Sequence, residues 1–301
     1  MIKLLGRYKN GNYTVRIYED GTKIRKTEAN EFIPEFAENI DIKITNKCTG
    51  INCQWCHEGS GECGRHGNIM GERFIDTLKP WQEVALGGGN VLEHPSLVPF
   101  LRKLRQRNVI ANITVNQIHF ERDHDIIQTL IDEELICGLG LSLVDPTQEF
   151  INKVQQYPNA VIHVINGILT KEQCATMCNQ DLKVLILGYK NLRRGTDYYK
   201  DKDSVILKNQ NWLYDHLPQM LNEFELISFD NLAIEQLDAE RLMSEEEWDE
   251  FYMGDDGNHT FYIDMVNRQF SRSSTAPFSK RYELLDDVAK MFEHIRKTNI
   301  D

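Results

Sequence analysis

The stretch "NKCTGINCQWCHEGSGEC", residues 46 to 63, contains four of the seven cysteines in this 301-residue chain. Cys48, Cys53 and Cys56 have four and then two residues between them, and Cys63 follows further along. In a reducing compartment, clustered cysteines bind metal or do chemistry more often than they form disulfides. An odd number of cysteines fits this interpretation. The spacing therefore predicts that the first three thiolates converge on one metal centre.

Three kinds of metal site are compatible with this spacing. A structural zinc site needs a fourth ligand, for which Cys63, His57 and His66 are available, but zinc usually uses two Cys-x2-Cys pairs and only one is present. A plant-type ferredoxin has the same spacing and a distant fourth cysteine, but it is a small electron carrier. The third possibility is a [4Fe-4S] cluster bound by three cysteines, which leaves one iron open to a small molecule.

Composition and charge limit the class of protein. With 41% hydrophobic residues, the chain can form a large buried core. Its formal net charge of -12 makes duplex DNA an improbable partner, although a patch around Arg193 and Arg194 leaves nucleic acid open. No apolar run approaches the roughly 18 residues of a membrane span, and the first residues lack the apolar region of a signal peptide. We therefore expect a cytoplasmic protein with no membrane partner.

The elements that position the cysteines follow an alternating pattern. Residues 1 to 28 predict a small antiparallel hairpin, because Asn-Gly and Asp-Gly turns interrupt strand formers. From residue 39, apolar strands alternate with helices, which indicates an α/β fold with a parallel sheet, either a barrel or an open sheet. The predicted strands are 40–45, 83–87, 109–115, 136–144, 160–166, 182–187 and 225–232. The predicted helices are 71–79, 95–107, 123–134, 146–156, 171–179 and 210–224.

The cysteine loop begins where the first of these strands ends, and parallel sheets bind their ligands at the carboxyl ends of strands. The tail predicts a further helix, a hairpin at 261–273 and a terminal helix at 280–297. We expect three parts: an N-terminal hairpin extension at 1–38, a core at 39–235 and a C-terminal cap of helix and hairpin at 236–301.

The cysteine loop resembles that of the radical S-adenosylmethionine (SAM) superfamily. Those enzymes carry Cys-x3-Cys-x2-Cys with an aromatic residue before the last cysteine, and Trp55 matches that aromatic. The chain departs from the motif by one extra residue between Cys48 and Cys53. The resemblance implies a partial (β/α)6 barrel, with a [4Fe-4S] cluster on Cys48, Cys53 and Cys56 and with SAM bound at the open iron.

The resemblance also implies a reaction. The cluster would cleave SAM reductively to a 5'-deoxyadenosyl radical, which would abstract hydrogen from a small-molecule, nucleotide or peptide substrate. The electron would come from a reductant such as flavodoxin or ferredoxin. The alternative from another class is a non-catalytic or electron-transfer protein with a zinc or ferredoxin-like iron-sulfur site.

Further segments at strand ends resemble the SAM-binding segments of the family. "GGGNVLEHP", residues 87 to 95, is similar to a Gly-Gly-Glu-Pro segment, but Asn90 stands where the glutamate is usual and Glu93 is the nearest acid. Glycine lets the main chain approach a ligand closely. The resemblance assigns SAM contacts to the following residues: Gly87, Gly88, Gly89, Asn90, Asn116, Ser142, Gly167, Leu187 and Gly188.

The remaining cysteines and the polar residues beside the motif have simpler explanations. Cys137, Cys174 and Cys178 fit buried small hydrophobic positions, and Cys63 fits an exposed thiol better than a ligand. His57 and Glu58 are either solvated loop residues or hydrogen-bond partners of the cluster, SAM or substrate. Because the sequence after residue 178 contains no cysteine, an auxiliary cluster in the tail is excluded.

Overall fold

The computed structural model describes residues 2–298, which form two sheets. The smaller sheet has the order β1-β2-β3, and the larger has the order β10-β9-β8-β7-β6-β5-β4-β11-β12-β13. The strands of the smaller sheet are β1 (Leu4–Asn10), β2 (Tyr13–Tyr18) and β3 (Lys23–Lys26). Those of the larger sheet are β4 (Asn39–Thr45), β5 (Glu83–Gly88), β6 (Ile110–Asn116), β7 (Gly138–Ser142), β8 (Ala160–Ile165), β9 (Lys183–Leu187), β10 (Leu226–Phe229), β11 (Thr260–Asp264), β12 (Gln269–Ser271) and β13 (Tyr282–Glu283).

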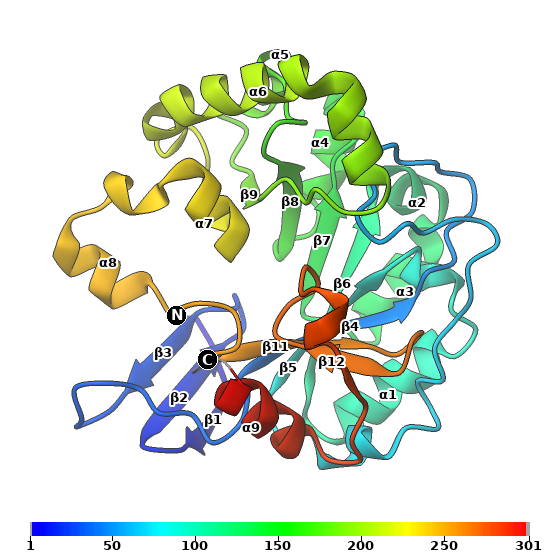
Figure 1. Ribbon diagram of the computed structural model, residues 1–301, viewed down its shortest axis with the longest axis vertical. Coiled ribbons are helices and arrows are strands. Elements are labelled where there is room, and N and C mark those ends of the chain that lie inside the picture. The colour runs from blue at the N-terminus through cyan, green and yellow to red at the C-terminus, as the bar shows by residue number, and fades with distance from the viewer. Residues whose placement is uncertain (1, 299–301) are drawn as a thin grey trace.

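The strands from β4 to β10 form a curved parallel sheet, in which each strand pairs with the next along the chain. Helices surround the outside of this curve (Figure 1). They are α1 (Leu97–Gln106), α2 (Gln117–Arg122), α3 (His124–Asp132), α4 (Gln148–Val154), α5 (Lys171–Met177) and α6 (Arg194–Met220). The predicted α/β class and partial barrel are confirmed, and the sheet of the described residues stays open.

Alternation along the strands separates the core from the inner face of the curve. In β4, Ile40, Ile42 and Ile44 are buried in the main hydrophobic core. Successive side chains of a strand point to opposite faces, so Asp41 and Lys43 point to the inner face. The outer face therefore packs against helices, while the inner face carries polar residues that are available to a ligand.

The C-terminal tail extends the parallel sheet. The predicted hairpin at 261–273 is present as β11 and β12, and β11 also pairs in parallel with β4. β13 pairs with β12, so the terminal helix α9 (Val288–Thr298) begins later than the predicted residue 280. The tail thus places new side chains beside the strand that precedes the cysteine loop.

Several predicted boundaries were wrong. The predicted helix at 71–79 is only the 3-10 helix η1 (Arg73–Thr77), since Pro80 follows closely and disfavours helical backbone before it. The predicted helix at 210–224 is the second part of α6, which begins at Arg194. The predicted strand at 225–232 ends at Phe229, because Asp230 caps the next helix through its side chain.

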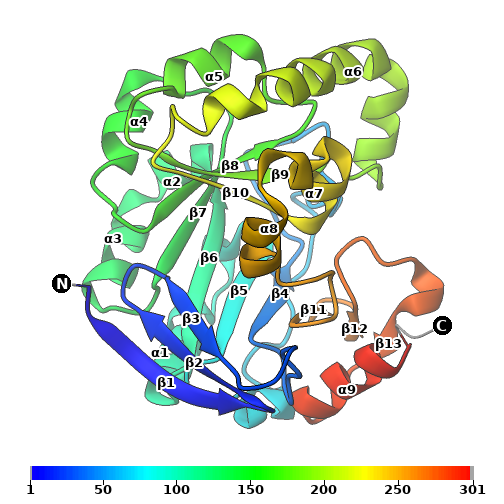
Figure 2. The same cartoon turned by 90° about the vertical axis from the view of Figure 1, so that its left-hand side faces the viewer.

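Two further helices cover the region after β10: α7 (Asn231–Leu237) and α8 (Glu245–Phe251). They lie between the end of the parallel strands and the tail (Figures 1 and 2). Within residues 2–298, no helix is both long and apolar enough to cross a membrane.

The N-terminal segment forms the predicted antiparallel piece as a sheet of three strands (Figure 2). Its buried side chains pack with Ile110, the first residue of β6. Asn159, just before β8, donates from Nδ2 to the Glu19 carbonyl oxygen at 3.0 Å. Both contacts lie at the amino ends of the parallel strands, so the small sheet is at the end opposite the cysteine loop.

Candidate cofactor and substrate site

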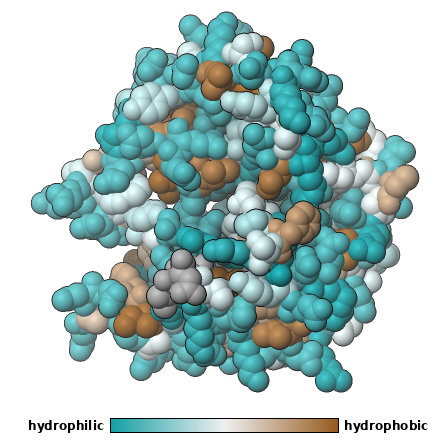
Figure 3. Space-filling model, viewed as in Figure 1, coloured by the Kyte–Doolittle hydropathy of each residue, from teal (hydrophilic) through white to brown (hydrophobic). Residues whose placement is uncertain are grey.

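A cavity of about 1050 Å³ occupies the inner side of the curved sheet. Its lining includes Cys48, Cys53 and Cys56 from the loop after β4, together with inner-face residues of every parallel strand. The face shown in Figure 3 is largely hydrophilic, with hydrophobic residues gathered around its central hollow. The three cysteines predicted as ligands therefore lie at the carboxyl ends of the strands and border one common space.

The cysteine loop is held by backbone contacts. The amide of Cys48 donates to the Gly61 carbonyl oxygen at 3.0 Å. Arg194, the first residue of α6, donates from Nε to the Cys53 carbonyl oxygen at 3.0 Å and from Nη2 to the Ser60 carbonyl oxygen at 2.8 Å. Arg194, which the sequence suggested as part of a basic patch for phosphate or nucleic acid, thus anchors the loop.

The three thiols influence one another electrostatically. Burial raises the pKa of Cys48 to about 11, and the neighbouring Cys53 and Cys56 raise it further in the same direction. The side-chain amide Nδ2 of Asn116 lies 3.9 Å from the Cys53 sulfur. Three adjacent thiolates repel one another without a counter-charge, and metal binding supplies that charge while releasing the thiol protons.

A cluster and a single ion require different arrangements of the cysteines. Among residues 2–298, no group of three or more His, Cys, Asp and Glu residues is placed to hold one metal ion. In a four-iron cluster, by contrast, each cysteine binds a different iron. Cys63 is exposed and is absent from the cavity lining, and His66 Nδ1 lies 2.9 Å from Thr45 Oγ1. Neither of these two candidate zinc ligands lines the cavity that the three cysteines border.

The three glycines at the end of β5, two within the strand and one directly after it, have different surroundings. Gly88 has φ +113°, and a Cβ there would lie 2.1 Å from the Thr45 carbonyl oxygen. A Cβ on Gly89 would lie 2.1 Å from the Lys47 carbonyl oxygen. Gly87 lines the cavity with nothing within 4 Å of its Cβ position. Because they lack a Cβ, Gly88 and Gly89 can pack against Thr45 and Lys47, the residues just before Cys48. Gly87 has free space beside its backbone, which a ligand can occupy.

Asn90 supports the cysteine loop from outside the cavity lining. Its Oδ1 accepts a hydrogen bond from the Leu92 amide at 3.1 Å, and its Nδ2 donates to Glu93 Oε1 at 3.0 Å. The same Glu93 oxygen accepts hydrogen bonds from the Thr49 amide at 3.0 Å and the Thr49 hydroxyl at 2.6 Å. The acid nearest the glycines thus holds the segment between Cys48 and Cys53.

Four of the other predicted SAM contacts line the cavity and one does not. Asn116, Ser142, Leu187 and Gly188 stand at the ends of β6, β7 and β9 and border the space. Gly167, with φ +91°, lies behind them, where a Cβ would come within 2.7 Å of an Ile206 methyl group. Gly167 thus permits the close approach of α6.

Glu58 is a structural residue that the sequence left undecided. It is 8% exposed, and Lys43 Nζ donates to its Oε2 at 2.7 Å while the Tyr262 hydroxyl donates to its Oε1 at 3.0 Å. Lys43 Nζ also lies 3.4 Å from Asp264 Oδ2. Burial alone would raise the pKa of Glu58, but His57, Lys43 and Arg193 outweigh it and lower the pKa. This network joins the cysteine loop to β4 and β11.

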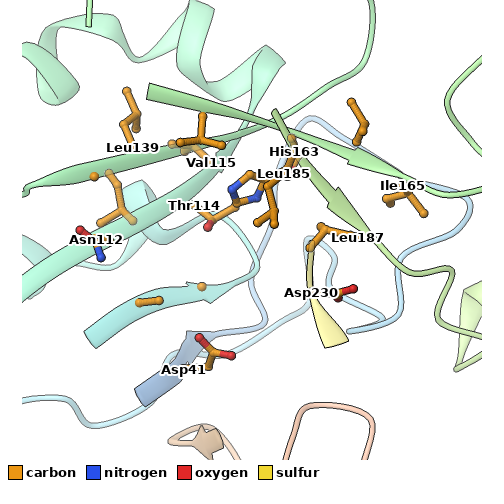
Figure 4. Close-up of a pocket in the computed structure, with 18 of the residues that line it drawn as sticks. Asp41, Asn112, Thr114, Val115, Leu139, His163, Ile165, Leu185, Leu187 and Asp230 are labelled. Carbon is orange, nitrogen blue, oxygen red and sulfur yellow. The ribbon is translucent and has the colours of Figure 1, made fainter. Parts of the chain in front are cut away.

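Further polar groups face the middle of the cavity from separate strands (Figure 4). They are Asp41 on β4, Asn112 and Thr114 on β6, His163 on β8 and Asp230 after β10. Sequence reasoning missed all of them, although isolated polar residues in otherwise apolar strands such as "NIDIKIT" and "AVIHVIN" were the available signal. They form a polar interior below the cysteine loop.

Burial shapes the ionisation of two of these groups. It lowers the pKa of His163 to about 4, and the charge of Lys190 lowers it as well. It raises the pKa of Asp41 to about 6; Lys190 opposes this rise, while Asp256 and Asp230 increase it. At neutral pH the cavity therefore holds a neutral imidazole and a carboxylate whose charge is poorly compensated.

The fold is similar to solved structures of SuiB from Streptococcus suis. The structure with the precursor peptide SuiA has a TM-score of 0.55 at 14% sequence identity, covering 80% of this chain and 60% of that one. The structure with S-adenosylmethionine has a TM-score of 0.54 at 14% identity, covering 80% and 61%. A third SuiB structure has a TM-score of 0.55 at 11% identity, covering 88% and 81%.

This likeness confirms the predicted class of fold. The chain spans 60% to 61% of the length of the first two SuiB structures. No protein-family model and no curated protein matches the sequence.

Proposed function

We propose that the chain is a radical SAM enzyme in which Cys48, Cys53 and Cys56 hold a [4Fe-4S] cluster. The observation that carries this proposal is that the three cysteines, directly after the first parallel strand, line one cavity at the carboxyl ends of the sheet. Ligands of parallel α/β sheets bind at this end. The shared fold with SuiB, which has been solved with S-adenosylmethionine, supports the same cofactor here.

The residues of this chain have distinct roles in the proposal. A bound cluster would supply the electron that cleaves SAM into methionine and the 5'-deoxyadenosyl radical. Gly87 would present open backbone to SAM, and Asn116 would hold its amide close to the sulfur of Cys53. The SAM contacts of the proposal are the cavity-lining members of the predicted set: Gly87, Gly88, Gly89, Asn116, Ser142, Leu187 and Gly188.

We favour a peptide substrate over a nucleotide or another small molecule. SuiB has been solved with its precursor peptide SuiA, and this chain shares that fold. The cavity of about 1050 Å³ is at the upper end of typical ligand pockets, about 300–1,000 Å³, and so has room beyond a single cofactor. A reductant such as flavodoxin or ferredoxin would supply the electron.

Metal analysis of protein purified without oxygen tests the cluster assignment. We expect about four irons and four sulfides per chain, as a [4Fe-4S] cluster requires. Cys48→Ala, Cys53→Ala and Cys56→Ala should each lose the iron, whereas the matched Cys63→Ala variant should retain it. Stoichiometric zinc without sulfide would contradict the proposal and support the structural metal site instead. Loss of iron in Cys63→Ala would overturn the three-ligand assignment.

A further inference from the structure

We propose that Asp41 and His163 bind a cationic group of the substrate, a primary ammonium or a guanidinium, in the middle of the cavity. This inference rests on the proposed function, because it takes the cavity below the cysteine loop as the place where substrate reacts. It concerns side chains that are separate from the cysteines and from the predicted SAM contacts.

Asp41 has a carboxylate that faces the cavity without a partner among the described residues. It lies on the inner face of β4, and it lines the cavity. Among residues 2–298, no hydrogen-bond donor lies within bonding distance of its carboxylate, and no cation pairs with it at 4.0 Å or less. Lys43, the next inner-face residue of the same strand, is paired with both Glu58 and Asp264. Asp41 is exposed to the cavity, and a cationic ligand in that space can pair with its carboxylate.

His163 places an imidazole ring in the same cavity. It lies on β8, and its ring projects into the same cavity, across from Asp41 (Figure 4). Gly140 on the neighbouring β7 makes room for this ring, because a Cβ at that position would lie 2.4 Å from His163 Cε1. No side chain or backbone group of the described residues forms a hydrogen bond with the imidazole. A neutral imidazole can accept a hydrogen bond from a substrate nitrogen.

The surrounding charges favour a cation over a neutral group. Asp230 and Asp256 line the same cavity, and Lys190 Nζ lies 3.7 Å from Asp230 Oδ2. Asp256 accepts a hydrogen bond from Asn231 at 2.8 Å, which brings no charge. Asp41, Asp230 and Asp256 are thus three carboxylates near two cations, Lys190 and Arg272, and the guanidinium of Arg272 also pairs with Asp255. A positive substrate group would offset the excess negative charge.

Two matched peptides test this inference on the protein with its cluster and SAM. The probes are N-acetyl-Gly-Lys-Gly-amide and the same peptide with norleucine, which keeps the aliphatic chain and lacks the ammonium. Dissociation constants are measured by saturation-transfer NMR without oxygen. We expect the lysine peptide to bind about tenfold more tightly, and we expect Asp41→Asn to abolish this preference. Asp125→Asn, which makes the same change at an exposed position of α3, should retain it.

Other results would show whether the cationic site, the role of His163 or the proposed function is wrong. Equal binding of the two peptides by the wild-type protein, or a preference that survives in Asp41→Asn, would overturn the inference. His163→Phe keeps a ring of similar size and should weaken the lysine peptide several-fold; an unchanged dissociation constant would remove His163 from the site. Formation of 5'-deoxyadenosine by the wild-type protein is measured separately. If it fails while the peptide preference persists, the proposed function is wrong and the cationic site remains.

Discussion

Asp41 and Lys43 are two residues apart on the inner face of β4, but their surroundings differ. Lys43 is 2% exposed and paired with two carboxylates, whereas Asp41 faces the open cavity without a partner among the described residues. The first belongs to a framework that fixes the cysteine loop, and the second is available to a ligand. Near the carboxyl end of β4, Lys43 therefore fixes the loop that would hold the cofactor. Asp41, two residues earlier, is placed to contact the substrate.

The largest loss of unfolding free energy is expected from removing the positive charge of Lys43. Lys43→Met would leave Glu58 and Asp264 buried without their cation, and breaking a buried ion pair costs about 3–5 kcal/mol. Chemical denaturation should show this loss of unfolding free energy, and the iron content should fall because the loop loses its anchor. Adding Glu58→Gln should restore part of the stability. A single variant as stable as the wild type would contradict the framework role.

A smaller loss of unfolding free energy is expected from substitution of Gly88, which packs against the residues just before the cysteine loop. Gly88→Ala adds a Cβ at 2.1 Å from the Thr45 carbonyl oxygen on a backbone with φ +113°, a strain of about 1–3 kcal/mol. We expect a lower melting temperature together with reduced iron content. Weakened SAM binding with both properties unchanged would limit Gly88 to the proposed SAM contact and contradict its role in packing the loop.

Gly87 should separate ligand binding from stability. Nothing lies within 4 Å of its Cβ position, and φ is not in the left-handed region, so Gly87→Val can be accommodated by the fold. If open backbone at this position contacts SAM, the valine should weaken SAM about tenfold with the cluster intact. Equilibrium dialysis with labelled SAM measures this, and unchanged affinity would remove Gly87 from the site.

The smallest effect concerns Asp41 and pH. Its pKa is raised to about 6, so its carboxylate is charged above that pH and the charge disfavours the folded state. Asp41→Asn should therefore slightly raise the melting temperature at pH 7.5, and the difference should disappear as the pH falls below 6. Lysine-peptide binding should weaken over the same interval, because protonation removes the charge. His163, with a pKa lowered to about 4, stays neutral there. A destabilised Asp41→Asn protein would indicate a structural role.

The sequence predicted the parts of the molecule that depend on local pattern. The parallel strands were predicted because apolar runs alternate with helices, and the cysteine loop was located because it follows the first of these strands. The pairing of β11 with β4 could not be predicted, because residues 39 and 260 come together only in the folded chain. The early start of α6 was missed because "RGTDYYKDKD" lacks helical periodicity, and its position depends on Arg194 binding the cysteine loop.

The same limit applies to the candidate site: its local motifs could be predicted from the sequence, and its long-range contacts could not. The three cysteines and the three glycines at 87–89 stand in short local motifs, so the sequence could place them at strand ends, where they line the cavity. The partners of Glu58 come from Lys43 on β4 and Tyr262 on β11, which are distant in sequence, and no motif marks them. Asp41 and His163 gave a weak signal, a single polar residue on the inward side of an apolar strand. Only the curvature of the sheet shows that both face one cavity.

Formation of 5'-deoxyadenosine is the most direct test of the central claim. Anaerobic protein with its cluster reconstituted is incubated with SAM and dithionite, and the products are separated by liquid chromatography. We expect 5'-deoxyadenosine and methionine in equal amounts from the wild-type protein and from Cys63→Ala, with none from Cys56→Ala. A wild-type protein that contains the full cluster and leaves SAM intact would contradict it.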